Sequence, residues 1–300
     1  MVPNEISQED AGQRIARSTL ETSALASYRH IVSENALVDV RAMYRDLTAG
    51  MNSNEFATPI APWQDRGFRE GYLKASVLLH ESRNEWKAGV EFDRTEVREQ
   101  FRYVITDPSQ FDVGTPTSLS FADKETGVEA GAFVQDALHF GSWAMSAGLR
   151  WDRYKLLVKE NAFSPRFGLS KYFKKLDLSV YGSYDRAFQT PAIENLLLAS
   201  SPEIAVISSD VLRLPVRPSH GNFYEVGVTK AVAKKVRLNA NYYLRDMDEF
   251  ADDDLLLNTG VSFPIAFRSA KIYGAEAKLE IPRWNRFSGF VSYSYMVGRG

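Results

Sequence analysis

The sequence contains no cysteine, which excludes disulfide bonds, thiolate metal sites and a cysteine nucleophile. It also has no apolar run of about 18 residues, so it predicts no membrane-spanning helix. The formal net charge is -2, which leaves no basic excess for binding nucleic acid. These absences leave open a soluble protein or a barrel of transmembrane strands, because barrel strands give only a weak sequence signal.

The two ends of the sequence indicate a piece of a longer protein. The N-terminal stretch MVPNEISQEDAGQRIARSTL is polar and lacks the basic and apolar regions of a signal peptide. The C-terminal stretch FVSYSYMVGRG stops just after a strand pattern. We therefore expect residues 1–16 to be a polar lead-in and residues 17–300 to form one incomplete domain.

Apolar and polar residues alternate with a period of two, the pattern of a strand with two unlike faces. From Trp143 to Trp151 the odd positions are Trp, Met, Ala, Leu and Trp, and the even positions are Ala, Ser, Gly and Arg. The same template fits about a dozen segments, and no long amphipathic helix competes with it. The alternation does not say whether the apolar face packs in a core or meets lipid.

The connections favour lipid, because short polar turns alternate strictly with long segments, as at the two rims of a membrane barrel. Many strand candidates exceed ten residues, enough to cross a bilayer when tilted. The short turns lie near Ser33, Ser82, Phe140, Lys174, Ala233 and Pro282, and the long connections are expected at about 51–69, 105–124, 189–221 and 250–263, with a shorter one near Lys159.

Charged residues on the polar face also favour a barrel, because apolar residues that point outward leave the charges in a lumen where water or a polar plug can pair them. Aromatic residues near strand ends fit interfacial girdles. The sequence therefore predicts an all-β fold, an antiparallel transmembrane β-barrel that is partial, with about 12 strands of a larger barrel. The charges expected in the lumen are Arg150, Asp152, Arg237, Arg245, Glu276 and Lys278.

Several strand blocks resemble the TonB-dependent outer-membrane receptors, in the C-terminal part of their barrel. The resemblance covers roughly Val128 to Gly300, with the blocks in family order and at one-hairpin spacing. The blocks are FVQD at Phe133 with AGLRWDRY at Ala147, SPRFGLS at Ser164, YGSYDRAFQTP at Tyr181, NFYEVGVTK at Asn222 and YGAEAKLE at Tyr273.

The resemblance implies a barrel of about 22 strands blocked by an N-terminal plug. It implies TonB-dependent uptake of a scarce ligand of the siderophore, cobalamin or glycan class, in the bacterial outer membrane. The implied partners are outer-membrane lipid and the TonB complex, the latter through a missing N-terminal part. A signal peptide, a TonB box, a plug and a terminal aromatic strand are not found in this sequence, so we interpret it as a fragment and assign the function to the parent.

Three residues are candidates for ligand contact, namely Trp63, Arg66 and Phe68. They belong to the stretch NEFATPIAPWQDRGFREGY, expected to be a loop, whose aromatic rings and guanidinium groups can stack on a flat ligand and pair with an anionic one. An ordered surface loop is the plainer interpretation of the same stretch.

Two other stretches have structural interpretations. RAFQTPAIENLLLAS predicts a short loop helix with Thr190 as N-cap and Pro191 in its first turn, packed on the barrel rim or closing over ligand. DEFADDDLLLN holds five acidic residues but lacks the spacing and glycine of a calcium loop, so a solvated acidic loop is expected. The four histidines lack metal-ligand spacing, and we expect no metal site and no cofactor.

The sequence supports no catalytic function, since it has no nucleophile elbow, phosphate loop or dinucleotide fingerprint. A passive porin, or a structural or adhesive barrel, is the alternative to a transport receptor. A barrel hydrolase would need a serine, a histidine and a carboxylate or amide group that converge on one rim from distant strands. The identity of a transported ligand does not follow from the sequence.

Overall fold

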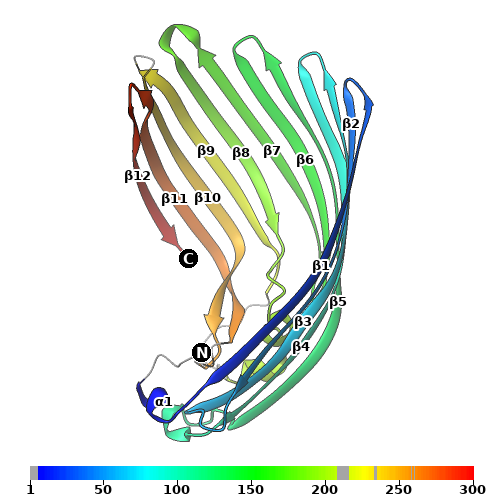
Figure 1. Cartoon of the computed structure of the whole chain (residues 1–300), viewed down its shortest axis with the longest axis vertical. Coiled ribbons are helices and arrows are strands. Elements are labelled where there is room, and N and C mark those ends of the chain that lie inside the picture. Colours follow the sequence, from blue (N-terminus) through cyan, green and yellow to red (C-terminus); the bar gives the residue numbers. More distant parts are fainter. Residues whose placement is uncertain (1–5, 208–215, 233–234, 258, 260) are drawn as a thin grey trace.

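A computed structural model describes residues 6–207, 216–232, 235–257, 259 and 261–300. Within them the chain forms twelve strands in one antiparallel sheet, and each strand pairs with the next in chain order. Figure 1 shows a curved wall, open between the edge strands β1 and β12. The strands are β1 (Ile15–Ser33), β2 (Ala36–Ser53), β3 (Ile60–Glu81), β4 (Asn84–Ile105), β5 (Ser118–Phe140), β6 (Trp143–Lys155), β7 (Lys159–Phe173), β8 (Leu178–Gln189), β9 (Ser219–Val232), β10 (Val236–Leu255), β11 (Ser262–Trp284) and β12 (Phe287–Arg299).

The helical segments are few and short in the described part of the chain. α1 (Ile6–Asp10) precedes the sheet, and η1 (Pro108–Gln110) and η2 (Lys174–Leu176) lie in connections. α2 (Leu196–Ala199) and α3 (Pro202–Ile207) lie between β8 and β9. No helix in the described residues is long and apolar enough to cross a membrane.

The predicted alternation of short and long connections holds in part, because the connection 156–158 between β6 and β7 has only three residues. The turns β1–β2, β3–β4, β5–β6, β7–β8 and β11–β12 are short and lie at one end of the sheet (Figure 1). The predicted turn at Ala233 lies outside the described residues. Three of the predicted long loops are wrong in extent, because β2, β3, β5, β10 and β11 continue into them. The connections shrink to 54–59, 106–117 and 256–261. Only the connection 190–218 keeps nearly its expected length.

Contacts of the short helix α2 identify the two faces of the sheet. α2 contacts β4 and β5 and also β11, so it lies on the concave face. Phe101 of β4 packs with Leu197 of α2, so the odd positions of β4 point inward and its even positions point outward. The register carries this parity from β4 through β5 to β6, and Val90 lies in line with Ala132 and Trp151.

The apolar face of the strands is therefore the convex face. Trp143 to Trp151 puts its apolar residues outward, and Val90 on β4 is 57% exposed. Along β6 the band covers nine positions, which at about 3.3 Å per residue and a tilt of about 40° gives a height of about 20 Å, close to that of a barrel's lipid-facing band. Other exposed outward residues of this band are Leu73, Leu79, Phe92, Val134, Leu149, Val180 and Val226.

Beyond this band the two faces exchange character. On the outer face of β4, Trp86, Ala88, Val90 and Phe92 are followed by Arg94, Glu96, Arg98, Gln100 and Arg102. On its inner face, Glu91 and Asp93 give way to apolar residues. Because charges on the outer face exclude hydrocarbon at that level, the far half of β4 stands clear of the apolar band. The inner apolar residues there are Val97, Phe101, Tyr103 and Ile105.

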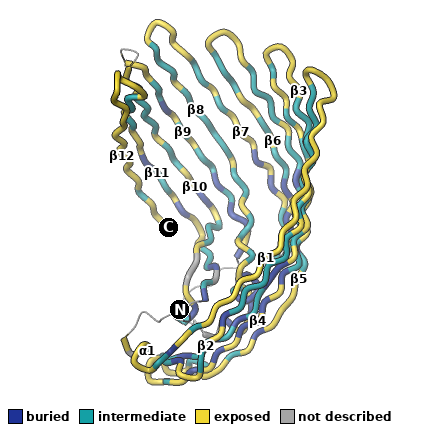
Figure 2. Tube along the Cα trace, in the orientation of Figure 1, coloured by how far each residue is buried: buried dark blue, intermediate teal, exposed yellow. Residues whose placement is uncertain are grey.

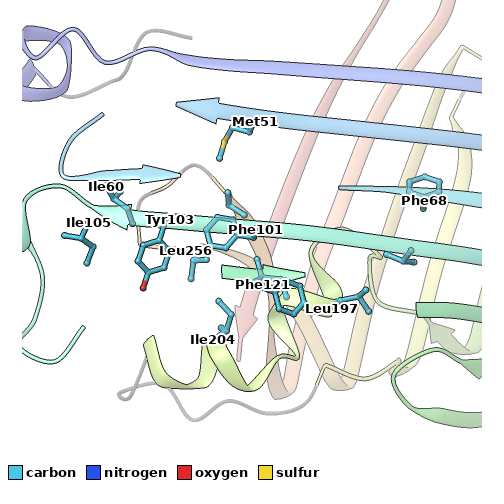
Figure 3. Close-up of a cluster of buried hydrophobic side chains, with 13 residues drawn as sticks. Met51, Ile60, Phe68, Phe101, Tyr103, Ile105, Phe121, Leu197, Ile204 and Leu256 are labelled. Atoms are coloured by element: carbon cyan, nitrogen blue, oxygen red, sulfur yellow. The ribbon is translucent and has the colours of Figure 1, made fainter. Parts of the chain in front are cut away.

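The main hydrophobic core fills the concave face beyond the band. Buried residues gather toward the ends of β2–β5 that lie away from the short turns (Figure 2). Phe101 and Tyr103 are each 1% exposed, and Leu197 of α2 and Ile204 of α3 lie beside the strand side chains (Figure 3). This core fixes α2 and α3, which follow β8, inside the curve of the sheet.

Candidate functional site

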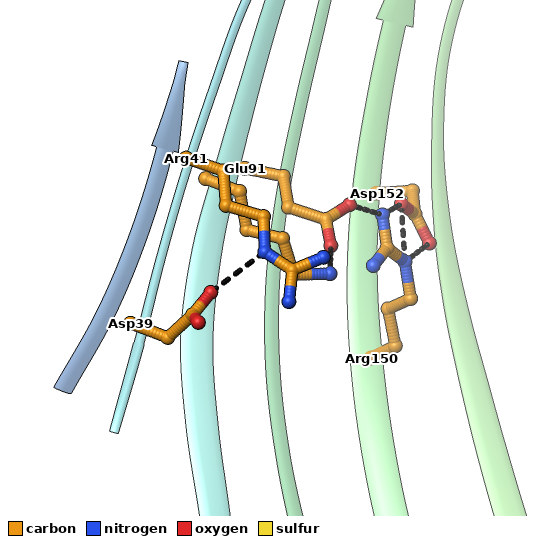
Figure 4. Close-up of polar contacts among 6 residues, drawn as sticks. Asp39, Arg41, Glu91, Arg150 and Asp152 are labelled. Carbon is orange, nitrogen blue, oxygen red and sulfur yellow. Dashed lines mark hydrogen bonds and ion pairs between the residues drawn. The ribbon is translucent and has the colours of Figure 1, made fainter. Parts of the chain in front are cut away.

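Charged side chains line the concave face at the level of the apolar band. Arg150 donates to Glu91 at 2.9 Å, and an oxygen of Asp152 lies 2.7 Å from the same guanidinium (Figure 4). Lys74 pairs with the other carboxylate oxygen of Glu91. All six charges expected in the lumen lie on this face by register, so that prediction is confirmed. The lumen wall is polar where the outer wall is apolar.

A cleft of about 400 Å³ opens beside this network. Carboxylates dominate the charged side chains that line this cleft. Four of them are acidic, namely Glu91, Asp93, Glu129 and Asp152, and two are basic, namely Arg150 and Arg153. The end of β8, at Phe188 and Gln189, forms its other side. A second cleft of about 240 Å³ lies between the inner faces of β1–β3 and the segment that follows β8, and Arg66 and Glu194 line it. Both clefts therefore border the connection between β8 and β9.

The described first part of that connection crosses the concavity from one side of the sheet to the other. We call residues 190–207 the inward segment. Asn195 accepts a hydrogen bond from Gln64 of β3 at 2.5 Å and donates one to the carbonyl of Ser262 in β11. Leu196, Leu197 and Leu198 are at most 2% exposed. The inward segment thus bridges strands that lie far apart in the sheet.

Glu99 of β4 holds the start of α2. Its two carboxylate oxygens accept hydrogen bonds from the backbone N–H groups of Leu197 at 3.3 Å and Leu198 at 2.9 Å. The side chain is buried among apolar neighbours, which raises the pKa of Glu99 to about 7, partly offset by the two N–H donors and by Arg66. Since its outward neighbours are Arg98 and Gln100, this carboxyl lies beyond the apolar band.

The raised pKa predicts that docking of the inward segment weakens as pH rises. A carboxyl whose docked pKa is about 7, above its ordinary 4.5, favours docking most below 4.5 and loses that contribution as pH rises through 7. Between pH 5.5 and 8 we expect exchange protection of the amides at 196–200, corrected for intrinsic rates, to fall on the order of tenfold. Glu99→Gln, which keeps an acceptor but cannot ionise, is the matched control and should remove the dependence. An equal pH response in both proteins would contradict the prediction.

The structure places the three predicted ligand contacts in strand β3, so their assignment to a loop is wrong. Arg66 and Phe68 point inward, where Arg66 pairs with Glu194 at 3.3 Å and Phe68 is buried in the core. Trp63 points outward, under the guanidinium of Arg102 at 4.7 Å from the ring centroid. The fold therefore separates Trp63 from the other two, and their contact with a ligand stays a prediction.

The predicted loop helix exists but begins later than expected. Asn195, with a left-handed φ of 58°, is its N-cap instead of Thr190, and it makes no side-chain capping bond. Pro191 lies outside the helix. The segment is packed, as the structural interpretation expected, but it packs inside the sheet, so its predicted position on the rim is wrong. Sequence reasoning missed Glu99, although a single carboxyl among Val97, Phe101 and Tyr103 on one strand face was a usable signal.

Metal ligation has no support among the residues that the structure describes, where no group of three histidine, cysteine or acidic side chains comes together. The acidic stretch belongs largely to β10, because Asp248 and Asp252 pair with β11, so the predicted loop is wrong there. The side chains of Asp253 and Asp254 lie outside the described residues. His220 contacts Glu160 at 2.5 Å, across the gap that opens between β7 and β8.

The sequence matches a family described as TonB dependent receptor-like, beta-barrel, over residues 6–300. The chain belongs to the TonB-dependent receptor β-barrel family. This match confirms the resemblance of the strand blocks and extends it to the first four strands. Members of this family are receptors of the bacterial outer membrane.

Solved structures share the fold of this receptor barrel at low sequence identity. The copper transporter OprC has a TM-score of 0.64 and 17% identity, covering 96% of this chain and 48% of that one. The ferric-catecholate import receptor Fiu from E. coli K12 has a TM-score of 0.64 and 13% identity, covering 94% of this chain and 47% of that one. The ferric yersiniabactin uptake receptor FyuA from Yersinia pestis has a TM-score of 0.66 and 10% identity, covering 95% of this chain and 43% of that one. Among curated sequences, none matches significantly.

This chain thus spans less than half the length of each of these structures. At such identities the likeness establishes the fold alone. Its open sheet, polar concave face and apolar convex face correspond to one side of a larger barrel wall.

Proposed function

We propose that this chain is part of the wall of an outer-membrane receptor that takes up a scarce ligand. The observation that carries the proposal is the family match over residues 6–300. The apolar convex face supports the membrane location, and the polar concave face supports a route for a polar ligand through the lumen. TonB supplies the coupling through a part of the receptor outside this chain.

The ligand belongs to the siderophore, cobalamin or glycan class, and it is bound where the inward segment borders the clefts. Of the three predicted contacts, Arg66 fits best, since its guanidinium lines the second cleft and pairs with the well-exposed Glu194. An anionic ligand group can replace that carboxylate on the guanidinium at small cost, because an exposed ion pair contributes little stability. Phe68 is buried in the core, and Trp63 lies on the outer face.

A growth test distinguishes this function from its alternatives. The full reading frame that contains this chain is expressed in a strain without its own receptors, with and without a functional TonB, on a panel of ferric siderophores, cobalamin and oligosaccharides as limiting nutrients. We expect one panel class to restore growth only in the TonB-positive strain. Restored growth without TonB would indicate a passive porin, and no growth on any class would favour a structural or adhesive barrel.

A further inference from the structure

Strand β5 has an edge that no other strand of the described chain covers. β4 pairs with β5 from Ser118 to Leu138, but β6 pairs with β5 only from Val128 onward, because β6 ends there at its hairpin with β7. β5 therefore extends past the end of β6 (Figure 1). We define the free edge as the side of residues 118–126 that faces away from β4. It lies within the sheet, apart from the outermost strands β1 and β12 where further barrel strands would join.

Backbone groups of the even positions point out of the free edge. The carbonyl of Thr117 accepts a hydrogen bond from the N–H of Ile105 in β4 at 2.7 Å, so the odd positions bond to β4. Consecutive residues of a strand direct their N–H and C=O groups to opposite sides, so those of Ser118, Ser120 and Ala122 point away from β4. All three residues are exposed, and within the described chain no backbone group bonds to them on that side.

Charged residues protect only one end of the free edge. The N–H of Lys124, which points the same way, donates to the carboxylate of Asp123 at 2.7 Å, and Glu125 adds a further charge. Charged side chains are a usual means of keeping foreign strands off a sheet edge. The stretch 118–122 has none, so its backbone groups stay open to another strand.

We infer that the free edge binds an extended segment of a partner protein, which adds to β5 as an antiparallel strand. Each open residue offers an N–H and a C=O, the pattern that a second extended backbone matches. Inward side chains of the added strand lie beside Leu119 and Phe121 at the margin of the core, where apolar residues fit. Asp123 and Glu125 share that face by register, and basic residues fit opposite them. The partner segment therefore runs from basic to apolar residues, with polar residues between them.

The free edge is accessible from water. On the outer face beside it, Lys124 is 64% exposed and lies directly opposite Arg98 of β4, and charges at this level exclude hydrocarbon. Binding at this edge goes beyond the proposed uptake, and it depends neither on the transported ligand nor on TonB.

The test uses a short labelled peptide in which threonine alternates first with lysine and then with isoleucine. Antiparallel to β5, its lysines lie opposite Asp123 and Glu125, its isoleucines opposite Leu119 and Phe121, and its threonines opposite the even positions. Fluorescence anisotropy measures its binding to the purified full-length receptor in detergent. Methylation of the threonine N–H groups, which point toward β5, should weaken binding at least about tenfold. Methylation of the lysine and isoleucine N–H groups, which point away, is the matched control and should leave binding unchanged.

Hydrogen exchange locates the bound peptide on the receptor. The amides of Ser120 and Ala122 should gain protection on the order of tenfold, whereas those of Leu119 and Phe121 should change little, because they already bond to β4.

Receptor variants test the same contacts from the other side. Ala122→Pro removes an N–H of the free edge without removing a bond to β4, and it should abolish most of the binding. Ala122→Ser keeps that N–H and should bind as the unchanged receptor does. Asp123→Asn/Glu125→Gln leaves the backbone intact and should weaken binding about threefold to tenfold, so it decides the question if Ala122→Pro does not fold.

Equal affinities of the two methylated peptides would overturn the inference, as would unchanged binding to Ala122→Pro and to the double variant, or no binding of the unmethylated peptide. A second copy of the receptor is the other occupant that the test recognises. It would bring two copies of residue 122 face to face, so disulfide-linked dimers of Ala122→Cys that the peptide does not prevent would also overturn the inference.

Discussion

In the variant Arg66→Cys/Glu194→Cys, a reducible bis-thiosulfonate crosslinker is expected to abolish TonB-dependent growth on the compound that the panel identifies. The two native side chains lie 3.3 Å apart and join the inward segment to β3. Because this segment bridges β3 and β11 across the concavity, a ligand that passes there must displace it. Reduction of the crosslink should restore growth. The receptor chain has no native cysteine, so the reagent joins only the introduced thiols of this part of the protein.

The matched control for the crosslink is Glu21→Cys/Arg45→Cys. These residues also form an inward ion pair, at 2.8 Å, but they lie on the neighbouring strands β1 and β2. A crosslink there restrains strands that are already hydrogen-bonded, so growth should persist. Uninterrupted growth with the 66–194 crosslink complete would show that the inward segment does not need to move. A block in both crosslinked variants would assign the effect to the reagent.

Val90→Arg is expected to destabilise the receptor by about 2–4 kcal/mol, the cost of a cation near the midplane on the lipid face of a barrel. Val90 lies within the apolar band of β4, with Ala132 and Trp151 in line beside it on β5 and β6. The free energy of unfolding in micelles, from urea denaturation, measures the loss. The amount of receptor inserted in the outer membrane should fall in parallel.

Gln100→Arg is the matched control for this substitution. It adds the same side chain to the same face of the same strand, ten positions further along, where Arg98 and Arg102 are already exposed. Its effect should stay within about 0.5 kcal/mol, as for an ordinary surface substitution. Equal losses at positions 90 and 100 would mean that the convex face meets one solvent along its whole length.

The strands and their two faces could be predicted because a period-two pattern states which residues share a side. Trp143 to Trp151 indicated a two-faced strand, and the placement of Arg150 and Asp152 toward the lumen followed from it. Hairpin order also followed, because short turns leave neighbouring strands few other partners. The fold class was thus accessible from local pattern alone.

The extent of the strands and the inward segment were not accessible in the same way. Beyond Phe92 the outer positions of β4 become charged while its inner positions become apolar, so a fixed apolar-out template no longer describes the strand. The same exchange placed Phe68 in an expected loop. Docking of Leu197 and Leu198 on Glu99 joins positions about a hundred residues apart, which no local pattern encodes.

A nitroxide scan of single cysteines along β4, from Trp86 to Arg102, tests the central claim that the convex face meets lipid up to Phe92 and water beyond it. Accessibility is measured to oxygen, which concentrates in hydrocarbon, and to a water-soluble nickel chelate. The account predicts oxygen maxima at 86, 88, 90 and 92, and nickel maxima at 94, 96, 98, 100 and 102. Nickel accessibility at every even position from 86 onward would contradict it.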